Sequence, residues 1–309
     1  MNWLRTQTTG LYNTWSSVKD TKNMKLFLGE KWYLDLPDGD RLCLLVNVPN
    51  TAITKDDVIV VVHGLAGAAT DPSVVHIAEK FLSEGHIVVR VNLRGSGHGA
   101  GLAKNIYHAG HDIDFESVVA AVAERFNDKR VVLVGMSLSC NMMFRYLAKN
   151  LDAPVSRALA LSPVVDLPIA SQKLSHAYLG MINKSVLSFL KSYFVKRKRA
   201  FADTTVPDWD RIKKFYEFDE LYIAPLFGFK SVADYYSSTT ALPLIGDVKT
   251  PWTAVLSLDD PIAVSEKRIF KKKFAKNTIV LPSGGHLYFK KYGGLGEVAY
   301  KVFSQNNNS

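Results

Sequence analysis

Short apolar segments alternate with helical patterns along most of this chain, and this alternation limits its possible folds more than any other feature. Strands are expected at residues 32–36, 41–48, 58–62, 87–92, 131–134, 158–161, 253–258 and 278–281. Helices are expected between them, at residues 73–83, 112–126, 138–149, 264–274 and 295–303. Strands that alternate with helices favour a parallel sheet, because each helix carries the chain back across the sheet. The sequence therefore predicts an α/β fold with a doubly wound, mostly parallel, eight-stranded sheet.

One segment, between residues 167 and 248, interrupts this alternation. It has helical periodicity, as the spacing of Leu174, Tyr178 and Met181 indicates, but no good strand. We expect a helical insertion that lies over the strand ends as a lid; the alternative is a helical excursion without a gating role. A chain of 309 residues, 47% of them hydrophobic, is long enough for one domain with such an insertion. The expected parts are an N-terminal segment without an assigned role, an α/β core in two pieces and the cap: residues 1–30, 31–166 with 249–309, and 167–248.

A serine follows the fifth expected strand, in the sequence Gly135-Met-Ser137-Leu-Ser139. A serine at a sharp turn from a strand into a helix has an exposed hydroxyl and the N–H groups of the helix N-terminus beneath it. This arrangement, called a nucleophile elbow, suits acyl transfer through Ser137. The usual pattern is G-x-S-x-G, and Ser139 stands where the second glycine is expected. The alternative is a buried serine that opens a core helix.

A nucleophilic serine needs a base, and elbows of this kind have the chain order serine, acid, histidine. Of the eight histidines, His176 and His286 follow Ser137. His286 lies in a glycine-rich loop directly after the last expected strand, where it can reach a serine at the strand ends. We expect His286 to be the base; the alternative is a solvated loop histidine.

An acid is expected between the serine and the histidine, because a carboxylate orients the imidazole. The apolar run at 252–258 ends in Asp259-Asp260-Pro261. Ligands of open α/β sheets bind at the carboxyl ends of the strands, so the three groups fall on one rim. Asp260 is the preferred acid because it directly precedes a proline that fixes the turn, and Asp259 is left to cap that turn. The alternative is an Asp-Asp-Pro turn without a catalytic role.

A loop of small residues, His63-Gly-Leu-Ala-Gly67, follows the expected strand at 58–62. Its backbone N–H groups can point at negative charge that develops beside the serine. We expect the N–H groups of Leu65 and Leu138 to form an oxyanion hole. His63 is expected to be structural rather than a second base.

Two further patterns suggest a cofactor or a metal, but neither is complete. Gly95-Ser-Gly97-His-Gly-Ala100 fits the loose dinucleotide fingerprint, yet no helix opens directly after it and no acidic residue stands at the required position about 20 residues later. A nearby cluster contains His108, His111, Asp112 and Asp114. Its spacing matches no zinc pattern, and Asp112 is expected to cap a helix. We therefore expect neither a cofactor nor a bound metal.

These motifs and several others occur along the chain in a specific order. They are His63-Gly-Leu-x-Gly67, Asn92-Leu-Arg94-Gly95, Ile106-Tyr107-His108-x-Gly110, the serine elbow, Phe218-Asp219-Glu220, Ala224-Pro225-Leu-x-Gly228-Phe229, Asp234-Tyr235-Tyr236, Asp260-Pro261 and Gly284-Gly285-His286. Over about residues 30–305 the chain resembles the YheT-like branch of the α/β hydrolases, which includes abhydrolase-domain lipases and the fungal medium-chain fatty-acid ethyl ester synthases. The resemblance implies an α/β-hydrolase fold and a serine esterase or acyltransferase with Ser137, Asp260 and His286 as its triad. Ser139 departs from the family pattern, and the first thirty residues lack an obvious counterpart.

The chain is basic, with a net charge of +9 and local runs at 196–199, 271–273 and 290–291. Such charge favours anionic partners, among them acyl carrier groups, fatty acids and an anionic membrane surface. We expect weak peripheral contact with an anionic membrane. A nucleic-acid partner is not expected, because no aromatic-interleaved basic motif or recognition helix is present. Near the N-terminus, five apolar residues with approximate helical spacing suit packing on the domain or docking on lipid: Trp3, Leu4, Leu11, Trp15 and Val18.

Targeting signals and cysteine usage bear on the compartment. No apolar stretch reaches the roughly 18 residues of a membrane span, and the N-terminus does not have the pattern of a signal peptide. Cys43 and Cys140 are expected to be small buried hydrophobic residues rather than a disulfide. We therefore expect a cytoplasmic protein.

The expected activity is hydrolysis of carboxylic esters with short- to medium-chain acyl groups, through the triad and an acyl-enzyme. The expected lid is rich in Leu, Ile, Phe, Tyr and Met and has few carboxylates before Asp203, so an apolar acyl chain fits better than a sugar or a peptide. Acyl transfer to alcohols is expected as a side activity, because water and alcohols attack the same acyl-enzyme. Two alternatives stay open: an alcohol O-acyltransferase on this scaffold, and a non-catalytic protein that binds a lipid or a partner, its elbow having drifted at Ser139.

Overall fold

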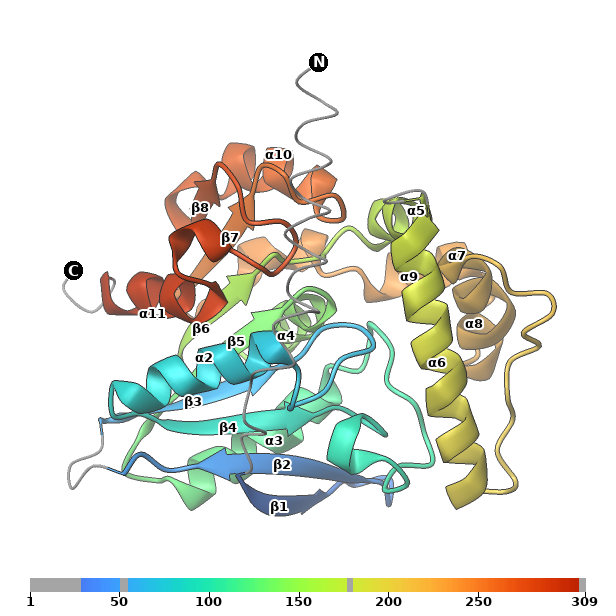
Figure 1. Ribbon diagram of the computed structural model, residues 1–309, viewed down its shortest axis with the longest axis horizontal. Helices are drawn as coiled ribbons and strands as arrows, with labels where there is room; N and C mark the ends of the chain where they lie inside the picture. Colours follow the sequence, from blue (N-terminus) through green and yellow to red (C-terminus); the bar gives the residue numbers. More distant parts are fainter. Residues whose placement is uncertain (1–28, 51–54, 177–179, 306–309) are drawn as a thin grey trace.

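All eight expected strands are present, and they pair into one sheet in the order β1-β2-β4-β3-β5-β6-β7-β8 (Figure 1). Their bounds are β1 Glu30–Asp35, β2 Arg41–Asn47, β3 Asp57–Val62, β4 Ile87–Asn92, β5 Arg130–Met136, β6 Val155–Leu161, β7 Trp252–Ser257 and β8 Thr278–Leu281. β2 pairs antiparallel with both β1 and β4, and all other neighbouring strands are parallel. The prediction of a doubly wound, mostly parallel sheet is confirmed.

This structure is a computed structural model that describes residues 29–50, 55–176 and 180–305. Most of the N-terminal segment to which no role was assigned, including its five apolar residues, lies outside the described residues.

Both faces of the sheet are covered by helices, which is why every residue of β3 is buried. Successive side chains of a strand point to opposite faces. Val60 accordingly belongs to the hydrophobic core between the sheet and the helices on one face. Val61 belongs to the core on the other face. The first face is covered by α3 Ile113–Arg125, α4 Leu138–Lys149 and α10 Val264–Lys273, and the second by α2 Pro72–Ser83 and α11 Leu295–Gln305.

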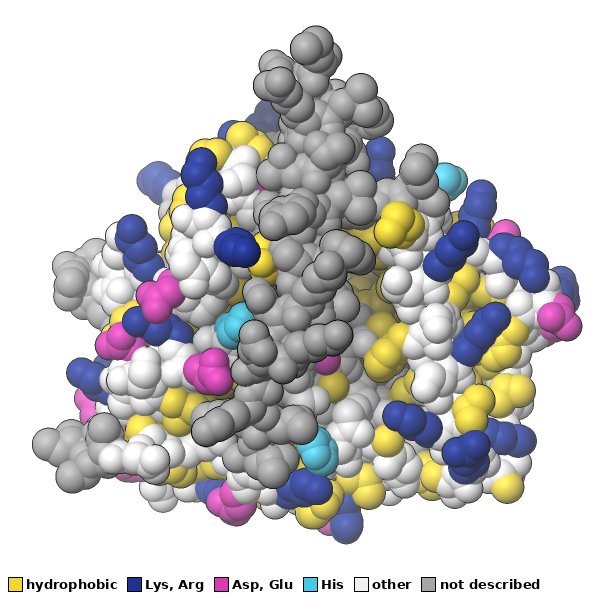
Figure 2. All heavy atoms as spheres, viewed as in Figure 1, with side chains coloured by type: hydrophobic (Ala, Val, Ile, Leu, Met, Phe, Trp, Pro, Cys, Tyr) yellow, Lys and Arg dark blue, Asp and Glu magenta, His cyan; other side chains and the backbone are white. Residues whose placement is uncertain are grey.

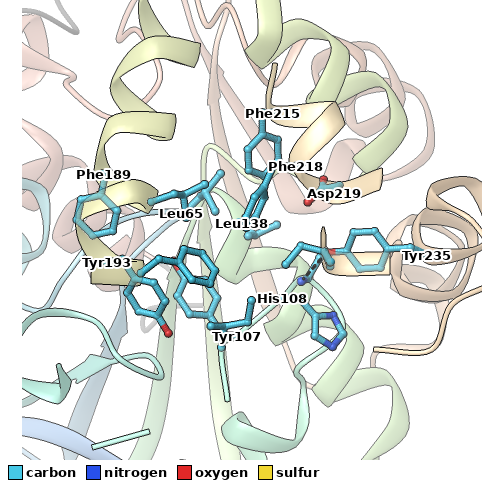
Figure 3. A pocket seen from close by; sticks show the side chains of 15 residues that line it. Leu65, Tyr107, His108, Leu138, Phe189, Tyr193, Phe215, Phe218, Asp219 and Tyr235 are labelled. Carbon is cyan, nitrogen blue, oxygen red and sulfur yellow. Dashed lines mark hydrogen bonds between the residues drawn. The ribbon is translucent and has the colours of Figure 1, made fainter. Parts of the chain in front are cut away.

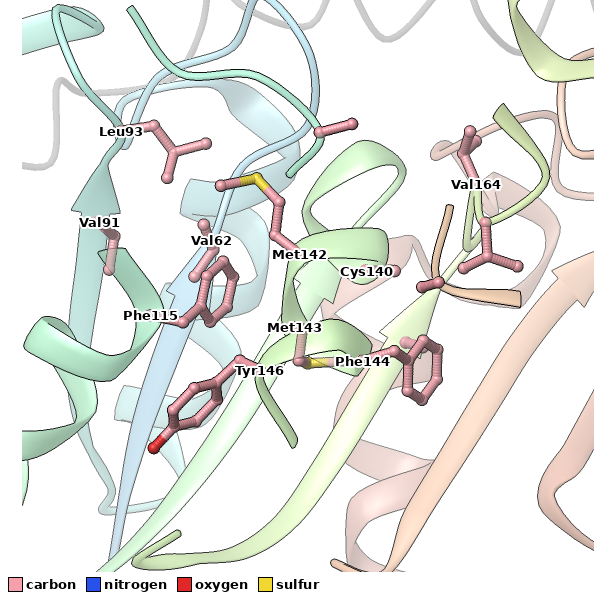
Figure 4. Close-up of a cluster of buried hydrophobic side chains, with 14 of the residues drawn as sticks. Val62, Val91, Leu93, Phe115, Cys140, Met142, Met143, Phe144, Tyr146 and Val164 are labelled. Carbon is pink, nitrogen blue, oxygen red and sulfur yellow. The ribbon is translucent and has the colours of Figure 1, made fainter. Parts of the chain in front are cut away.

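The helix that follows the serine is fixed by the core beneath it. Figure 4 shows Met142, Met143 and Phe144 of α4 among side chains of the sheet, with Phe115 of α3 alongside. The four side chains are at most 2% exposed. Burial of each such side chain contributes about 1.5–3 kcal/mol to stability. The N-terminus of α4 is therefore held firmly at the end of β5.

Between β6 and β7 the described part of the chain is helical and contains no strand. Its elements are α5 Leu167–His176, α6 Met181–Ala200, α7 Phe215–Phe218, the π-helix η4 Asp219–Ile223, α8 Ala224–Leu226, α9 Val232–Thr239 and the 3-10 helix η5 Leu242–Asp247. Figure 1 shows α6 as a long rod beside the ends of the strands. Among the helices that the structure describes, none has the length and the apolar character needed to cross a membrane. The boundaries of this insertion as a separate cap, and its role as a lid, stay predictions.

The remaining loops hold three short 3-10 helices: η2 Gly97–Gly99, η6 Ala275–Asn277 and η7 Lys290–Tyr292. The glycine-rich segment at 95–101 forms only the first of these, and the next α-helix begins at Ile113. The predicted cap at Asp112 is wrong in one respect. Asp112 stands at the N-cap position of α3, but its carboxylate makes no capping bond; instead it accepts hydrogen bonds from Arg145 and Lys149 of α4. Cys43 and Cys140 are both buried and free, as expected.

Candidate active site

Ser137 is the single residue between the end of β5 and the start of α4. Its backbone has a positive φ of 53°, a strained conformation for a residue with a side chain. Two glycines make room for this turn. A Cβ on Gly135 would lie 3.3 Å from the backbone of Cys140, and one on Gly64 would lie 3.0 Å from the Cβ of Ser137. The strand, the helix and the loop after β3 therefore meet closely around Ser137.

Ser139 fits the position where the family pattern has glycine. Its side chain is fully buried, and its Oγ accepts a hydrogen bond from the N–H of Met136 at 2.8 Å. The same hydroxyl lies 2.9 Å from the carbonyl oxygens of Val62 and Met136, to either of which it can donate. The hydroxyl thus connects the ends of β3 and β5, which a glycine at this position cannot do.

His286 lies between Ser137 and Asp260. The distance from Ser137 Oγ to His286 Nε2 is 2.8 Å, and the distance from His286 Nδ1 to Asp260 Oδ2 is also 2.8 Å. An ionised carboxylate only accepts hydrogen bonds, so Nδ1 carries the hydrogen and donates to Asp260. In the neutral imidazole Nε2 is then free to accept the hydrogen of Ser137. The arrangement has the geometry of a nucleophile, a base and an acid that orients the base.

Asp260 is buried, and its second oxygen, Oδ1, accepts the N–H groups of Ile262 and Ala263 at 2.8 and 3.0 Å. Burial by itself raises the pKa of this carboxyl, but the charge and hydrogen bond of His286 and the two backbone bonds outweigh it. The pKa of Asp260 therefore lies below its ordinary value, and the group is ionised at neutral pH.

Asp259 does not cap the turn, which corrects the expectation from the sequence. Its Oδ1 accepts the N–H groups of Gly284 and Gly285, both at 2.8 Å. Ser257 donates to the carbonyl of Gly285 at 2.6 Å. These bonds fix the glycine-rich loop that carries His286, so Asp259 acts on the position of the histidine through the backbone.

The two expected oxyanion donors, Leu65 and Leu138, line the same cavity as Ser137. Leu138 is the first residue of α4, so its N–H has no acceptor within the helix. Four of the five amides of the loop after β3 have acceptors. The N–H groups of residues 66, 67, 68 and 69 donate to Tyr107 Oη, the Gly64 carbonyl, Asp71 Oδ2 and Asn92 Oδ1. Among residues 65–69 this leaves the N–H of Leu65 without an acceptor in the part of the chain that the structure describes.

His63 uses both ring nitrogens within the protein. Nδ1 lies 2.7 Å from the carbonyl oxygen of Gly64, to which it donates, and Nε2 accepts the N–H of Leu93 at 3.2 Å. Burial lowers the pKa of His63 to about 4, although the bond to Gly64 acts in the opposite direction. A neutral histidine with both nitrogens occupied supports the oxyanion loop and is not available as a second base.

The cluster of two histidines and two aspartates has other partners. Asp114 binds the guanidinium of Arg94 through both oxygens, and Asp112 binds the basic groups of α4. His108 accepts the N–H of Gly110, and burial lowers its pKa to about 3. No group of three or more potential ligand side chains that could hold a metal occurs among the described residues.

The cavity at the elbow has two arms with a common wall. The space between the side chains of each arm is about 480–490 Å³, part of which is open to solvent. One arm contains Ser137 and is bounded by α5, and the other extends to Phe189 and Tyr193 of α6. Figure 3 shows how the labelled side chains surround the second arm. The residues common to both arms are Leu65, Ala109, Leu138, Phe215, Asp219 and Tyr235.

Sequence reasoning did not assign a role to Asp219, which lies on this wall, or to Tyr236 and Ser171, which line only the arm that contains Ser137. The Tyr236 hydroxyl lies 2.8 Å from both Asp219 Oδ2 and Ser171 Oγ. Burial raises the pKa of Asp219 to about 7, and the hydrogen bond from Tyr236 opposes this rise. The available signal was the placing of two carboxylates, Glu217 and Asp219, among aromatic residues in Phe215-Tyr-Glu-Phe-Asp219.

Comparisons with known proteins agree with this geometry. A family model described as alpha/beta hydrolase fold matches residues 57–291. YheT of Escherichia coli is 26% identical over 232 residues, which are 74% of this chain and 68% of YheT. Medium-chain fatty acid ethyl ester synthase/esterase 2 of Saccharomyces cerevisiae is 25% identical over 230 residues, 66% of this chain and 51% of that protein. The resemblance to the YheT-like branch is confirmed.

Among solved structures, the esterase Pf2001 of Pyrococcus furiosus is similar in fold, with a TM-score of 0.54 and 14% sequence identity. The similarity covers 84% of this chain and 82% of Pf2001. The chain spans about half to two thirds of the length of the curated relatives it matches.

Proposed function

Since this chain belongs to the α/β-hydrolase family, we propose that it is a serine hydrolase that cleaves carboxylic esters through an acyl-enzyme. The observation that carries the proposal is the unbroken series of hydrogen bonds from Asp260 through His286 to Ser137, both 2.8 Å long. A serine hydroxyl is a weak nucleophile unless a base takes its proton, and His286 Nε2 is placed to take it.

In the proposed reaction, Ser137 Oγ attacks the ester carbonyl and its proton passes to His286 Nε2. The imidazolium that forms is stabilised by the ionised Asp260, and the N–H groups of Leu65 and Leu138 stabilise the oxyanion. His286 then gives the proton to the leaving alcohol, and the acyl group remains on Ser137. Water enters, gives a proton to His286 and attacks the acyl-enzyme, and the carboxylic acid leaves as Ser137 recovers its proton.

The proposed substrates are lipophilic esters with short- to medium-chain acyl groups. The walls of both arms are mostly aliphatic and aromatic, so they suit a hydrocarbon chain. A relative that is named a medium-chain fatty acid ethyl ester synthase/esterase supports this substrate class. The same name supports acyl transfer to an alcohol as a second outcome at this site, because an alcohol in one arm can attack the acyl-enzyme in place of water.

The proposed enzyme is favoured over a non-catalytic binding protein by the state of the elbow. An elbow whose sequence has changed after loss of activity is expected to lose its geometry. Here Ser137 keeps its strained backbone, and Ser139 makes a hydrogen bond to the end of β3. We propose that the insertion at 167–248 acts as a lid, because α5, α6 and α7 supply the outer walls of both arms.

Weak peripheral contact with an anionic membrane is proposed for the exposed face of α6. This helix contains no acidic residue, and its exposed cations are Lys184, Lys191, Lys196, Lys198 and Arg199. Met181, Phe189 and Val195 are exposed beside them, and Figure 2 shows basic and hydrophobic side chains together on this side of the molecule. Phe189 also lines the cavity, so a lipid surface held at α6 would lie next to the substrate arm.

The test of the proposed function is covalent labelling with a fluorophosphonate, followed by location of the modified residue by mass spectrometry. We expect modification of Ser137 and turnover of p-nitrophenyl esters from acetate to the medium-chain length, with ethyl esters formed when ethanol is added. Ser137→Ala is expected to lose labelling and to lose on the order of 10⁴-fold or more in kcat while it stays folded. Wild-type activity in Ser137→Ala, or no turnover of any ester, would overturn the proposal.

A further inference from the structure

Asp219 is the one carboxyl group among the described residues that line the cavity, and it belongs to the wall that both arms share. It opens the π-helix η4 and is only 4% exposed. Its neighbours on the wall are aliphatic or aromatic, among them Leu138, Phe215 and Tyr235. The lining residues that the structure describes include no lysine or arginine that could neutralise it. A carboxyl group in such surroundings is costly unless it has hydrogen-bond partners.

The two oxygens of Asp219 have different surroundings. Oδ2 accepts a hydrogen bond from Tyr236 at 2.8 Å. Oδ1 has no hydrogen-bond donor among the described residues, yet it is not one of the fully enclosed polar atoms, so it contacts the open space of the cavity. In Figure 3 the carboxyl oxygens of Asp219 are on the side of the group that faces Phe218 and Leu138. One oxygen is thus held by the protein and the other is available to a ligand.

The carboxyl group is also held in a fixed orientation. Ser171 of α5 lies 2.8 Å from the Tyr236 hydroxyl, and Tyr236 of α9 donates to Asp219. These three side chains come from three elements of the insertion, and the hydrogen-bonded series ends at the cavity wall. A side chain positioned in this way loses little entropy when it binds a ligand.

We infer that Asp219 determines substrate specificity by binding a hydroxyl group that the substrate carries within a few bonds of the scissile ester. A plain alkyl chain that packs against the shared wall leaves Oδ1 of Asp219 without a hydrogen-bond partner. A hydroxyl group of the substrate supplies that partner. The inference rests on the proposed function and narrows its substrate class from lipophilic esters to hydroxylated ones. A hydroxyl on the alcohol part and a hydroxyl on the acyl chain offer the same chemistry, and the experiment separates them.

A neutral hydroxyl group suits this site better than a cation. Burial raises the pKa of Asp219 to about 7, so at neutral pH the group exists in both protonation states. The ionised form accepts a hydrogen bond from a hydroxyl and the protonated form can donate one to it. A cationic substrate group would interact well with the ionised form alone.

The experiment compares two pairs of esters that differ by one hydroxyl group. The first pair is 2-hydroxyethyl octanoate and propyl octanoate, which places the hydroxyl on the alcohol part. The second is ethyl 3-hydroxyoctanoate and ethyl octanoate, which places it on the acyl chain. Rates are followed by titration of the released acid. We expect the wild-type protein to prefer the hydroxylated ester about tenfold in kcat/KM in one pair, which identifies the position of the hydroxyl.

Three variants assign this preference to Asp219. Asp219→Leu is expected to reduce the kcat/KM ratio to about one, and Asp219→Asn, which keeps the shape and can still form hydrogen bonds, to retain part of it. Glu220→Leu is the matched control: it removes the neighbouring carboxyl group of η4, which is exposed and does not line the cavity, and the ratio is expected to persist. If Asp219→Leu does not fold, the inference is tested by comparing the kcat/KM ratio of the wild-type protein with that of Asp219→Asn.

Equal rates within both pairs, or a preference that persists in Asp219→Leu, would overturn the inference and leave the proposed function intact. Absence of turnover on all four esters would instead overturn the proposed function, and the inference with it.

Discussion

Asp259 and Asp260 are adjacent in sequence but bind different parts of the same loop: Asp259 holds the backbone N–H groups of Gly284 and Gly285, and Asp260 holds the imidazole of His286. The two carboxylates therefore have separable tasks. One fixes where the loop lies, and the other fixes the tautomer of the histidine that the loop carries.

The first prediction compares Asp260→Asn with Asp259→Asn. An amide at 260 can donate to Nδ1 and so favours the wrong tautomer of His286, which is expected to reduce kcat about 10³- to 10⁴-fold. An amide at 259 still offers an oxygen to the two glycines, so its loss of kcat is expected to stay within about tenfold. Steady-state rates on a p-nitrophenyl ester, with circular dichroism as the check on folding, measure both. The reverse ranking would transfer the role of the acid to Asp259.

The second prediction concerns Ser139. Ser139→Ala leaves the buried N–H of Met136 and the carbonyl of Val62 without the hydroxyl, so we expect a loss of about 1–3 kcal/mol in the free energy of unfolding. Ser162 provides a matched control, because it is equally buried and its Oγ has no hydrogen-bond partner among the residues that the structure describes. Ser162→Ala is expected to change stability by less than about 0.5 kcal/mol. Urea denaturation measures both variants, and equal losses would refute a special role for the Ser139 hydroxyl.

The third prediction uses the pH dependence of stability. The pKa of His63 is about 4 in the folded protein, against an ordinary value of 6.5, so between these values the unfolded chain binds a proton that the folded protein does not. The contribution of His63 is therefore complete above pH 6.5 and is lost as the pH falls towards 4. We expect the stability difference between wild type and His63→Gln to shrink by up to about 3 kcal/mol over this range. A difference independent of pH would contradict the prediction.

Asp219 provides the control of opposite sign. Its pKa is about 7 in the folded protein, against an ordinary value of 3.8, so between these values the folded protein keeps a proton that the unfolded chain has lost. Its buried carboxyl therefore destabilises the wild type increasingly as the pH rises from about 4 to 7. Over that range Asp219→Asn is expected to gain stability relative to wild type.

The fourth prediction concerns the basic face of α6. Lys184→Glu with Arg199→Glu is expected to weaken binding to vesicles that contain anionic lipid by roughly tenfold or more, because each basic residue near such a surface contributes about 1 kcal/mol. Lys271→Glu with Lys272→Glu, on α10, makes the same change in net charge and is the control. Sedimentation with vesicles of phosphatidylcholine, with and without phosphatidylglycerol, measures binding. Equal effects of the two double variants would show that only net charge matters.

The sheet was predictable because its strands are local runs of apolar, mostly β-branched residues that end where the periodicity changes. The position of Asp260 beside His286 could also be predicted from the sequence. The proline that follows it has no N–H and fixes the turn, and the next two amides, of Ile262 and Ala263, then face the carboxylate.

The hydrogen bonds of Ser139 and Asp219 could not be predicted from the sequence, because they join segments that are distant along the chain. Ser139 is bonded to Val62, 77 residues away, so the value of its hydroxyl depends on the pairing of β3 with β5. Asp219 meets Tyr236, 17 residues later, only after the insertion has folded back over the sheet. Local periodicity contains no information on either contact.

The proposed base and acid follow β8 and β7, the last two strands of the sheet, whereas Ser137 follows the central strand β5. β8 is four residues long, half buried and paired on one side only, so it opens more easily than the fully buried strand β3. Such an opening separates the proton-handling pair from the nucleophile while the buried strands stay paired. Gentle heating is therefore expected to abolish the proposed activity reversibly below the melting temperature, so that the outer strand β8, rather than the buried interior, sets the working temperature.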